Sequence, residues 1–332
     1  MNSFGTIFKI TLYGASHQEE IGIIIDNVKP GLKIDLKALE AYLDLRKPNK
    51  KGTTPRKESD KPIIRTGLLN GLTTGTPLVI AFKNENIIEK DYHFILNHPR
   101  PSHADLVNKE KYFGFNDYRG GGASSGRMTV AICAAGFIAS AMKDWKIESR
   151  LIQVGNLTDM TKLDDYLLEV NKRNDSVGAI VEVTVKDCQK KLGEPFFQSV
   201  ESQIAAIIFS IPGVKAIEFG AGFKGINSLG SEYNDLIVNK VGKTKTNNDG
   251  GINGGITNGN DLVVRVFLKP ASSIGLAQET YNFKSDEIEP LTIKGRHDVC
   301  YALRTPVILE SAVLIALTDL YLLDNKFGEY NE

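Results

Sequence analysis

The stretch "DYRGGGASSGRMTVAICAAGFIASAM" (117–142) joins a glycine-rich loop to a segment that is apolar all round. Such a segment is typical of a helix that is buried on every side. Consecutive glycines let the backbone approach another group closely, and the first turn of a helix attracts anions. The hydroxyl of Ser124 or Ser125 would cap the helix. We therefore expect a buried helix with a ligand-binding loop at its start.

The loop has the glycine spacing of a phosphate-binding P-loop, because four residues separate Gly121 from Gly126 and a cation follows. A P-loop needs Lys and then Ser or Thr at that point, for the phosphates and for magnesium. Here Arg127 and Met128 occupy those places, and no apolar strand precedes the loop. A P-loop phosphotransferase that depends on ATP and magnesium is therefore disfavoured. The flanking Arg119 and Arg127 still favour an anionic ligand.

The segments on either side of this stretch mix strands and helices. Short apolar and β-branched runs predict strands over 7–12, 21–31, 72–86, 177–185 and 261–269. Apolar periodicity predicts helices over 35–46, 201–211 and 304–323, with Asp35 as the cap of the first. Because the elements show no regular βαβ alternation, the pattern favours an α+β layered fold over a doubly wound one.

Two further glycine-rich segments need interpretation. "GAGFKG" (220–225) fits the GxGxxG dinucleotide pattern, but no helical apolar period follows it, so we interpret it as a turn. The segment 242–260 is rich in glycine and asparagine and has the composition of a linker.

Composition restricts the class of protein. The 332 residues give a length-based expectation of about two domains. Forty basic and forty acidic residues cancel, which argues against nucleic-acid or membrane-surface binding. The three cysteines form no CxxC, which fits a reducing compartment. We find no signal peptide, and the run 130–142 is too short to span a bilayer, so we expect a cytoplasmic protein.

The segment "RKPNKKGTTPRK" (46–57) is a loop in which six of twelve residues are basic and none is acidic. Three interpretations are open: a solvated face, a nucleic-acid patch, or a lid of cations over a small polyanion. No aromatic residue is interleaved for base stacking, so nucleic acid is the weakest of the three. Lysine and arginine clusters bind phosphates and carboxylates through charge-assisted hydrogen bonds.

Three of the five histidines lie beside small or acidic residues in loop-like contexts: His17 in "GASHQ", His103 in "RPSHADL" and His297 in "KGRHDVC". Histidine is suited to general acid–base work because its ordinary pKa is about 6.5. The sequence contains neither HxxxH nor HxH, the histidine spacings that would indicate a metal site. His297 is followed directly by Asp298, but adjacency in sequence does not establish contact.

These loops, in this order, resemble chorismate synthase over nearly the whole chain. "GASHQEEIGIIIDNVKPG" (14–31) is similar to the first family signature, Gly-Glu-Ser-His-Gly with an Ile-Asp-Gly-x-Pro-Pro-Gly turn. "HADLVNKEKYFGFNDYRGGGASSGRMT" (103–129) is similar to the second, and "GRHDVCYALRTPVILESA" (295–312) to the third. "LGEPFF", "SIPGVKAIEFGAGF", "NNDGGINGGITNG" and "KPASSI" also resemble family segments.

The resemblance implies one interleaved α+β domain over residues 1–332, a layered β-α-β sandwich with a short disordered tail from about 325. It implies removal of phosphate from 5-enolpyruvylshikimate 3-phosphate (EPSP) to give chorismate, an anti-1,4-elimination in the shikimate pathway that requires reduced FMN. It also implies a homotetramer and an external source of reduced flavin, with NADPH as an indirect reductant. The 242–260 segment would then belong to the site and not to a linker.

The resemblance also assigns roles to individual residues. His103 would protonate or bind the leaving phosphate, His17 would hold or protonate reduced FMN, and Asp298 would take a proton at the flavin edge. The implied substrate cations are Arg46, Lys51, Arg56, Arg127 and Arg304. Arg46 also matches a position that the family associates with NADP(H). The implied flavin contacts are Ser124, Ser125, Pro212, Gly213, Gly254, Lys269, Pro270, Ala271, Ser272, Ser273 and Arg296.

The chain departs from the family pattern at four site-flanking positions: Ala15, Gln18, Ala123 and Met128 stand where the family has Glu, Gly, Arg and Glu. The substitution at Ala123 removes a cation from the flavin region. We expect an active divergent enzyme. The alternative is a catalytically degenerate protein of the same fold that binds flavin or a phosphorylated acid.

Overall fold

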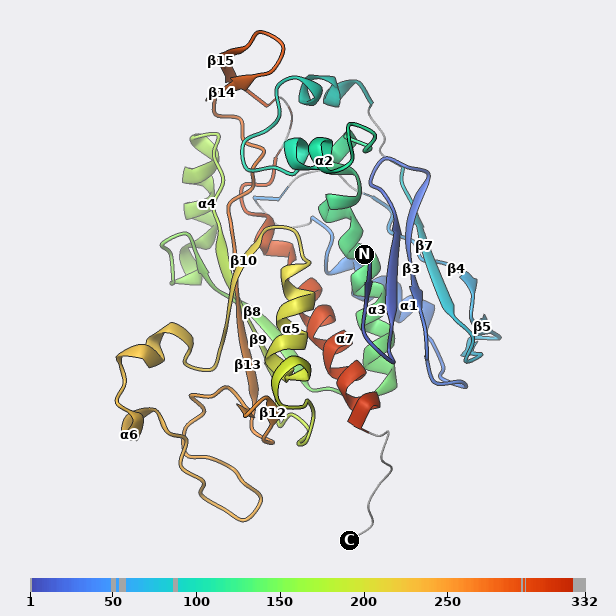
Figure 1. The fold of residues 1–332 in the computed structure, drawn as a ribbon, viewed down its shortest axis with the longest axis vertical. Coiled ribbons are helices and arrows are strands. Elements are labelled where there is room, and N and C mark those ends of the chain that lie inside the picture. Colours follow the sequence, from blue (N-terminus) through green and yellow to red (C-terminus); the bar gives the residue numbers. More distant parts are fainter. Residues whose placement is uncertain are drawn as a thin grey trace.

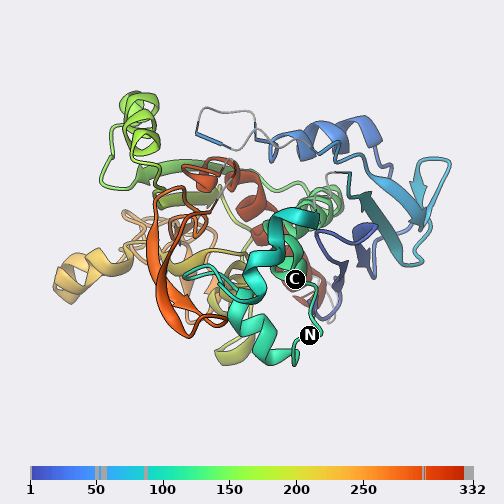
Figure 2. The same ribbon diagram turned by 90° about the horizontal axis from the view of Figure 1, so that it is seen from above.

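The computed structural model describes residues 2–48, 52–53, 58–85, 89–293, 295 and 297–324. Three of the predicted site residues, Lys51, Arg56 and Arg296, and the predicted tail from about 325 lie outside these ranges. Within them the chain forms two large antiparallel sheets, of five and four strands, with helices between (Figures 1 and 2).

The N-terminal part of the chain makes a five-stranded sheet in the order β1-β2-β3-β7-β4. Its central pairings align isoleucines across β2, β3 and β7, with Ile23 opposite Leu12 and Ile80. The strands are β1 (Ser3–Phe4), β2 (Ile10–Gly14), β3 (Glu20–Ile25), β4 (Ile63–Thr66) and β7 (Leu78–Lys83).

The C-terminal part contributes a four-stranded sheet in the order β10-β13-β9-β8. On the central strand β13 the residues alternate between buried and partly exposed, as expected for a sheet with one face on the core. The strands are β8 (Ile147–Val154), β9 (Ala179–Val185), β10 (Val214–Phe219) and β13 (Leu262–Leu268). Every pairing in both sheets is antiparallel, so the predicted α+β class is confirmed.

A layer of four helices separates the sheets: α1 (Leu36–Asp44), α3 (Thr129–Met142), α5 (Val200–Phe209) and α7 (Pro306–Asp324). In Figure 1, α3 and α7 lie side by side, with α3 against the five-stranded sheet and α7 toward the other. The two helices approach closely, because a Cβ on Gly136 of α3 would lie 2.5 Å from the Cα of Ser311 on α7. The architecture is therefore a β-α-β sandwich.

One hydrophobic core extends from the first sheet through the helices to the second. α7 is long and apolar enough to cross a membrane by length and composition, yet 72% of its most apolar window is buried. We therefore interpret α7 as the central core helix of the sandwich.

Local caps explain where several helices begin. The Asp35 carboxylate accepts hydrogen bonds from the N–H groups of Lys37 and Ala38, as the sequence predicted. Ser199 caps α5 in the same way. Ser125 caps the short 3-10 helix η3 (Gly126–Met128) and not α3 itself, because that extra turn lies between the loop and the helix.

The remaining elements lie outside the sandwich. The arm around α6 projects from it in Figures 1 and 2, and α2 lies above α3 at the top of Figure 1. These elements are η1 (Glu89–Leu96), α2 (Asp105–Lys111), η2 (Arg119–Ser124), η4 (Met160–Lys162), α4 (Leu163–Lys172), η5 (Phe196–Gln198), η6 (Gly222–Asn227), α6 (Gly230–Tyr233), η7 (Tyr301–Arg304), and the short strands β5 (Leu68–Leu69), β6 (Leu72–Thr73), β11 (Ile252–Asn253), β12 (Ile256–Thr257), β14 (Gln278–Asn282) and β15 (Glu287–Leu291).

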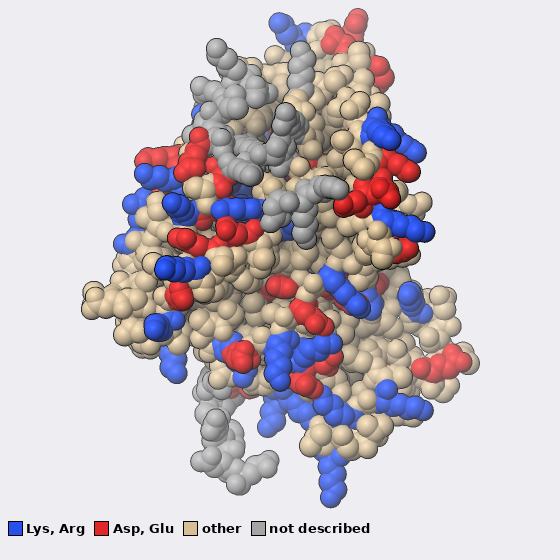
Figure 3. Space-filling view, turned by 180° about the vertical axis from the view of Figure 1, so that it is seen from behind, with Lys and Arg blue, Asp and Glu red and all other residues tan. Residues whose placement is uncertain are grey.

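Charged side chains of both signs are interspersed on the rear face of the molecule (Figure 3). Arg265, on the central strand β13, pairs with both Glu182 and Glu218 across neighbouring strands. The intermixed charges agree with the zero net charge of the sequence.

A buried carboxylate ties the two ends of the chain together. Asp319 of α7 accepts hydrogen bonds from the backbone N–H groups of Thr6, Ile7 and Phe8 at 2.7–2.8 Å.

Replacing Asp319 with Asn should lower the free energy of unfolding by about 2 kcal/mol, because an amide NH2 would then face at least one of these donors. Denaturant unfolding measures the change, and an unaltered midpoint would contradict it.

Candidate functional site

A cleft of about 920 Å³ brings together segments from all parts of the chain. His17, His103 and Asp298 line it, as do Arg46, Arg127 and Arg304. The predicted flavin contacts that line it are Ser124, Ser125, Pro212, Gly213, Lys269, Pro270, Ala271, Ser272 and Ser273. Three sequence signatures that are far apart in the chain therefore meet around one cavity.

The three glycines of the opening stretch let the backbone pack against both histidines. Gly120, Gly121 and Gly122 all have positive φ angles, of 55°, 85° and 55°. A Cβ on Gly120 would collide with the His17 ring, and one on Gly121 would lie 3.3 Å from Cε1 of His103. The Gly122 carbonyl accepts a hydrogen bond from Ser16 N at 3.2 Å. The absence of side chains at these glycines therefore leaves room for the imidazole rings of His17 and His103, in addition to any room it leaves for a ligand.

His17 is 3% exposed and is held from two sides. Its Nδ1 lies 3.0 Å from the hydroxyl of Ser16, which itself lies 3.3 Å from the carbonyls of Arg119 and Gly120. If the hydroxyl donates to one of these carbonyls, it can accept from Nδ1–H. Tyr92 packs edge-on against the imidazole, with ring centroids 4.9 Å apart.

His103 is oriented by a buried ion pair. Its Nδ1 lies 2.6 Å from Oδ1 of Asp105, and Arg100 donates to both oxygens of the same carboxylate. Burial would raise the pKa of Asp105, but hydrogen bonds from Arg100 and His103 outweigh it and hold that pKa well below its usual range. An ionised Asp105 accepts the Nδ1 proton, so Nε2 is the His103 atom that remains for a ligand.

The cationic wall of the cleft is built around two carboxylates. Asp60 pairs with Arg46 at 2.5 Å and also with Arg127. Asp298 pairs with Arg304 at 2.5 Å. The predicted substrate cations within the described residues are therefore gathered on one side of the cleft, and each has an acidic partner.

The 269–273 loop also lines the cleft. The Lys269 ammonium donates to the carbonyl of Ser102 at 2.5 Å and to the Ser272 hydroxyl at 2.7 Å. Ser102 directly precedes His103, so these bonds attach the histidine loop to the 269–273 loop. Burial, assisted by Lys215, lowers the pKa of Lys269.

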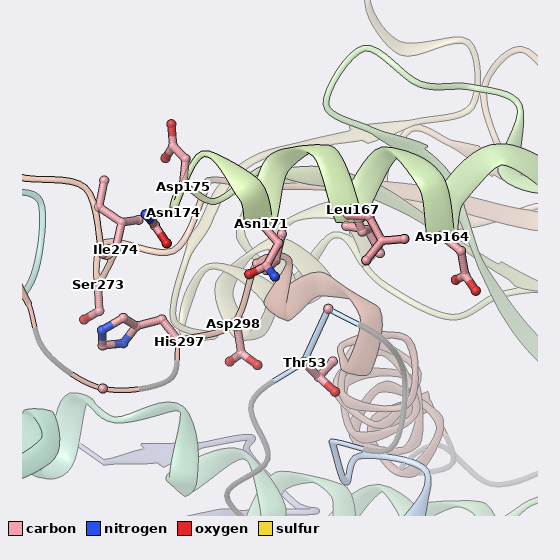
Figure 4. A pocket seen from close by; sticks show the side chains of 15 residues that line it. Thr53, Asp164, Leu167, Asn171, Asn174, Asp175, Ser273, Ile274, His297 and Asp298 are labelled. Atoms are coloured by element: carbon pink, nitrogen blue, oxygen red, sulfur yellow. The ribbon is translucent and has the colours of Figure 1, made fainter.

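A smaller cavity of about 350 Å³ adjoins the cleft and shares Ser273, His297 and Asp298 with it. Figure 4 shows Leu167 and Asn171 of α4 facing this cavity. The His297 Nε2 lies 3.1 Å from the carbonyl of Ile293, so it donates there. His297 is thus tied to its own loop, and both His297 and Asp298 line the two spaces.

One predicted site residue lies elsewhere. Gly254 is in the turn between β11 and β12 and is not among the residues that line the cleft. Gly255 beside it accepts from Val200 N at the start of α5, whereas Pro212 and Gly213 follow the other end of that helix. The ten residues of α5 span about 15 Å, so Gly254 lies away from the part of the cleft that Pro212 and Gly213 line, and its role as a flavin contact stays a prediction.

The sequence interpretation missed several residues that organise the site. Asp60, Asp105 and Arg100 hold its cations and His103, and Ser16 and Tyr92 contact His17. Asp105 follows His103 by two residues, which was a usable signal. Gln18, a departure from the family pattern, donates to Asp117 at 2.8 Å and so links the His17 turn to the glycine loop.

The cysteines do not contribute nucleophiles. Burial raises the pKa of Cys133 and Cys188 to about 12 and that of Cys300 to about 11. Thiols with such pKa values are protonated at neutral pH. Within the described part of the chain, no group of three or more His, Cys, Asp or Glu side chains could hold a metal ion.

Comparison with known proteins identifies the family. The family model described as chorismate synthase matches residues 8–322. The chain belongs to the chorismate synthase family. The activity of this family is that of a lyase, and the chain is an enzyme of this class.

Relatives and a solved structure agree with this assignment. A chorismate synthase of Chitinophaga pinensis is 47% identical over 328 residues, which cover 98% of each chain. Those of Cytophaga hutchinsonii and Thermococcus gammatolerans are each 37% identical over 352 residues. A crystal structure of a chorismate synthase superposes with a TM-score of 0.74 at 22% identity, over 96% of this chain and 92% of the other, and shows the same fold.

We predict that Gly120→Ala lowers turnover by roughly 100-fold, because the new methyl group would displace the His17 ring and the residue would keep a positive φ. Steady-state rates measure the effect. Gly230→Ala is the control, since a Cβ there meets nothing within 4 Å. Equal rates in the wild type and Gly120→Ala would contradict the role of Gly120.

We predict that Asp105→Asn destabilises the protein by about 3 kcal/mol at neutral pH, because it breaks a buried ion pair. The folded-state pKa of Asp105 is depressed, so its stabilising effect is present above the unfolded-state pKa, about 4, and is lost as pH falls below it. The stability difference between variant and wild type should therefore shrink below about pH 4 in acid unfolding curves. A difference that is constant down to low pH would contradict this.

Proposed function

We propose that this chain converts EPSP to chorismate by 1,4-elimination of phosphate and that it requires reduced FMN. The observation that supports this most is the meeting of His17, His103 and Asp298 with three arginines around one cleft. EPSP carries one phosphate and two carboxylates, so a wall of arginines matches its charge.

The elimination breaks one C–O bond and one C–H bond. Phosphate leaves with the C–O electron pair, the ring loses a proton, and a second ring double bond forms without net redox change. Negative charge therefore develops on the leaving oxygen. Cations that are already in place when the substrate binds stabilise that charge at no further cost of reorganisation.

His103 is suited to assist the leaving phosphate. Asp105 holds the Nδ1 proton, so a protonated His103 donates from Nε2. Its side chain is 24% exposed, which keeps it accessible from the cleft. Asp298, which pairs with Arg304 at 2.5 Å, is our candidate for accepting the proton at the flavin edge.

The cleft has polar groups that fit a flavin. Its volume of about 920 Å³ accommodates a flavin and a substrate together. Ser124, Ser125 and Lys269 line the cleft, and their hydroxyls and the third N–H of Lys269 would bind the polar parts of FMN. The Nε of Arg46 and the hydroxyl of Tyr301 are buried without a hydrogen-bond partner among the described residues, and both residues line the cleft.

When bound, reduced FMN would supply transient electron density to the breaking C–O bond. His17 lies deep in the cleft and would hold the flavin, with Ser16 fixing the orientation of the imidazole. Ala123 is exposed on the cleft where the family pattern has arginine. The remaining donors would then have to compensate for the missing cation.

Other aspects of the proposal follow from family membership. We propose a single domain, in line with the continuous core, and a homotetramer in the cytoplasm. Reduced FMN would come from an external reductase, with NADPH as the indirect reductant and Arg46 as its candidate contact. A degenerate binding protein of the same fold is the competing possibility.

The test is anaerobic incubation of the purified chain with chemically reduced FMN and EPSP, with phosphate and chorismate followed together. Equal release of both products supports the proposal. Absence of both, with flavin and substrate shown to bind by calorimetry, supports the degenerate binding protein instead.

In the same assay, His103→Ala should retain FMN binding and lose activity by ~100- to 10,000-fold, as expected for removal of a general acid. His93→Ala is the matched control, since His93 is exposed and does not line the cleft. Wild-type turnover by His103→Ala would exclude the proposed role of His103.

A further inference from the structure

Asp60 is a buried carboxylate with no role in the chemistry above, yet it contacts two arginines of the cleft. Its side chain is 1% exposed. Oδ2 accepts from Nη2 of Arg46 at 2.5 Å, and Oδ1 accepts from Nη1 of Arg127. Arg46 follows α1, whereas Arg127 lies in η3 ahead of α3. One carboxylate therefore joins cations from two separate parts of the fold.

The two arginines depend on Asp60 to different degrees. Arg127 is also fixed by the side chain of Asn84 at 3.1 Å and by the carbonyl of Lys83 at 3.0 Å. The Nε of Arg46, by contrast, is buried without a hydrogen-bond partner among the described residues. We therefore expect Arg46 to move more than Arg127 if the Asp60 carboxylate is lost.

The charges on this wall need a counterion. Arg46 and Arg304 line the same cleft. Burial lowers the pKa of Arg304, Asp298 opposes that effect, and the positive charge of Arg46 lowers it further. Burial alone would raise the pKa of Asp60, but Arg46 and Arg127 outweigh it and keep the carboxyl ionised. Like-charged groups at this density separate unless an anion lies between them.

The backbone at Asp60 is held in an uncommon conformation. Its φ angle is 51°, in the left-handed region, which aspartate and asparagine tolerate better than most side chains. Left-handed residues other than glycine persist where surrounding contacts determine them, often at functional sites. The same conformation makes Asn the substitution that disturbs the backbone least.

We propose that Asp60 is a positioning residue that holds Arg46 and Arg127 as one paired binding wall for an anionic group of the substrate, a carboxylate or a phosphate. This inference rests on the proposed function, because it takes the cleft as the EPSP site. Asp60 acts through the arginines and does not touch the substrate.

The test is Asp60→Asn, which keeps the shape of the side chain and removes its charge. The new amide can still accept from one arginine, but its NH2 group repels the other. The KM for EPSP should rise on the order of 10- to 100-fold, as expected for loss of a charged hydrogen bond, while kcat changes less. If only the net charge of the cleft mattered, the KM for EPSP should fall, because removing a negative charge makes the cleft more cationic.

Inhibition by inorganic phosphate distinguishes the positioning role of Asp60 from a simple effect of its charge. A small anion can follow the displaced arginines, so its inhibition constant should stay the same or fall even though KM rises. If KM and the phosphate inhibition constant both fall, Asp60 only reduces the charge of the cleft, and the proposal is wrong. If KM and the phosphate inhibition constant both rise, the substitution has disrupted the site as a whole. Asp60 would then have a structural role, and the positioning role would be wrong.

Asp319→Asn is the matched control, since Asp319 is an equally buried aspartate outside the cleft. It should lower the melting temperature and leave KM unchanged. An Asp60→Asn protein with the wild-type KM would overturn the inference while the proposed function stands. A wild-type enzyme without EPSP turnover would remove the proposed function itself, which makes the two failures distinguishable.

Discussion

Most of the site depends on one steric constraint, the absence of side chains at residues 120–122. The backbone there adopts left-handed angles and packs against His17 and His103, and α3 begins one short turn later. Because α3 is wedged between the first sheet and α7, the loop is anchored to the core of the sandwich. His17 and His103 are therefore anchored to the helical layer through a loop that has little freedom of its own.

Much of this arrangement could be predicted from the sequence. Uniform apolarity identified α3 and α7, and β-branched runs identified β3, β9 and β13, because buried elements have few alternative interpretations. The helix α4 and the strand β8 were missed. Both are only partly buried, and their polar residues interrupt the apolar pattern from which a helix or strand is predicted.

The site was predicted less completely than the fold. The signatures supplied the histidines and arginines, but the carboxylate that joins Arg46 to Arg127 was overlooked, because a buried aspartate and an exposed one look alike in a sequence. Gly254 is not among the residues that line the cleft, and similarity to a family segment says nothing about which end of α5 that segment adjoins. Spatial neighbours that are distant in the chain have to be read from the structure.

The attachment of the N-terminal segment to Asp319 also has a consequence for biosynthesis. The bonded residues are more than 310 positions apart, and the cleft needs groups from Ser16 to Arg304. During translation, the turn between β1 and β2 must wait for the last helix to leave the ribosome before the N–H groups of residues 6–8 find this acceptor. A chain with contacts of such high sequence separation folds slowly and exposes strand edges meanwhile, so its yield in the cell should depend on chaperones more than its small size suggests.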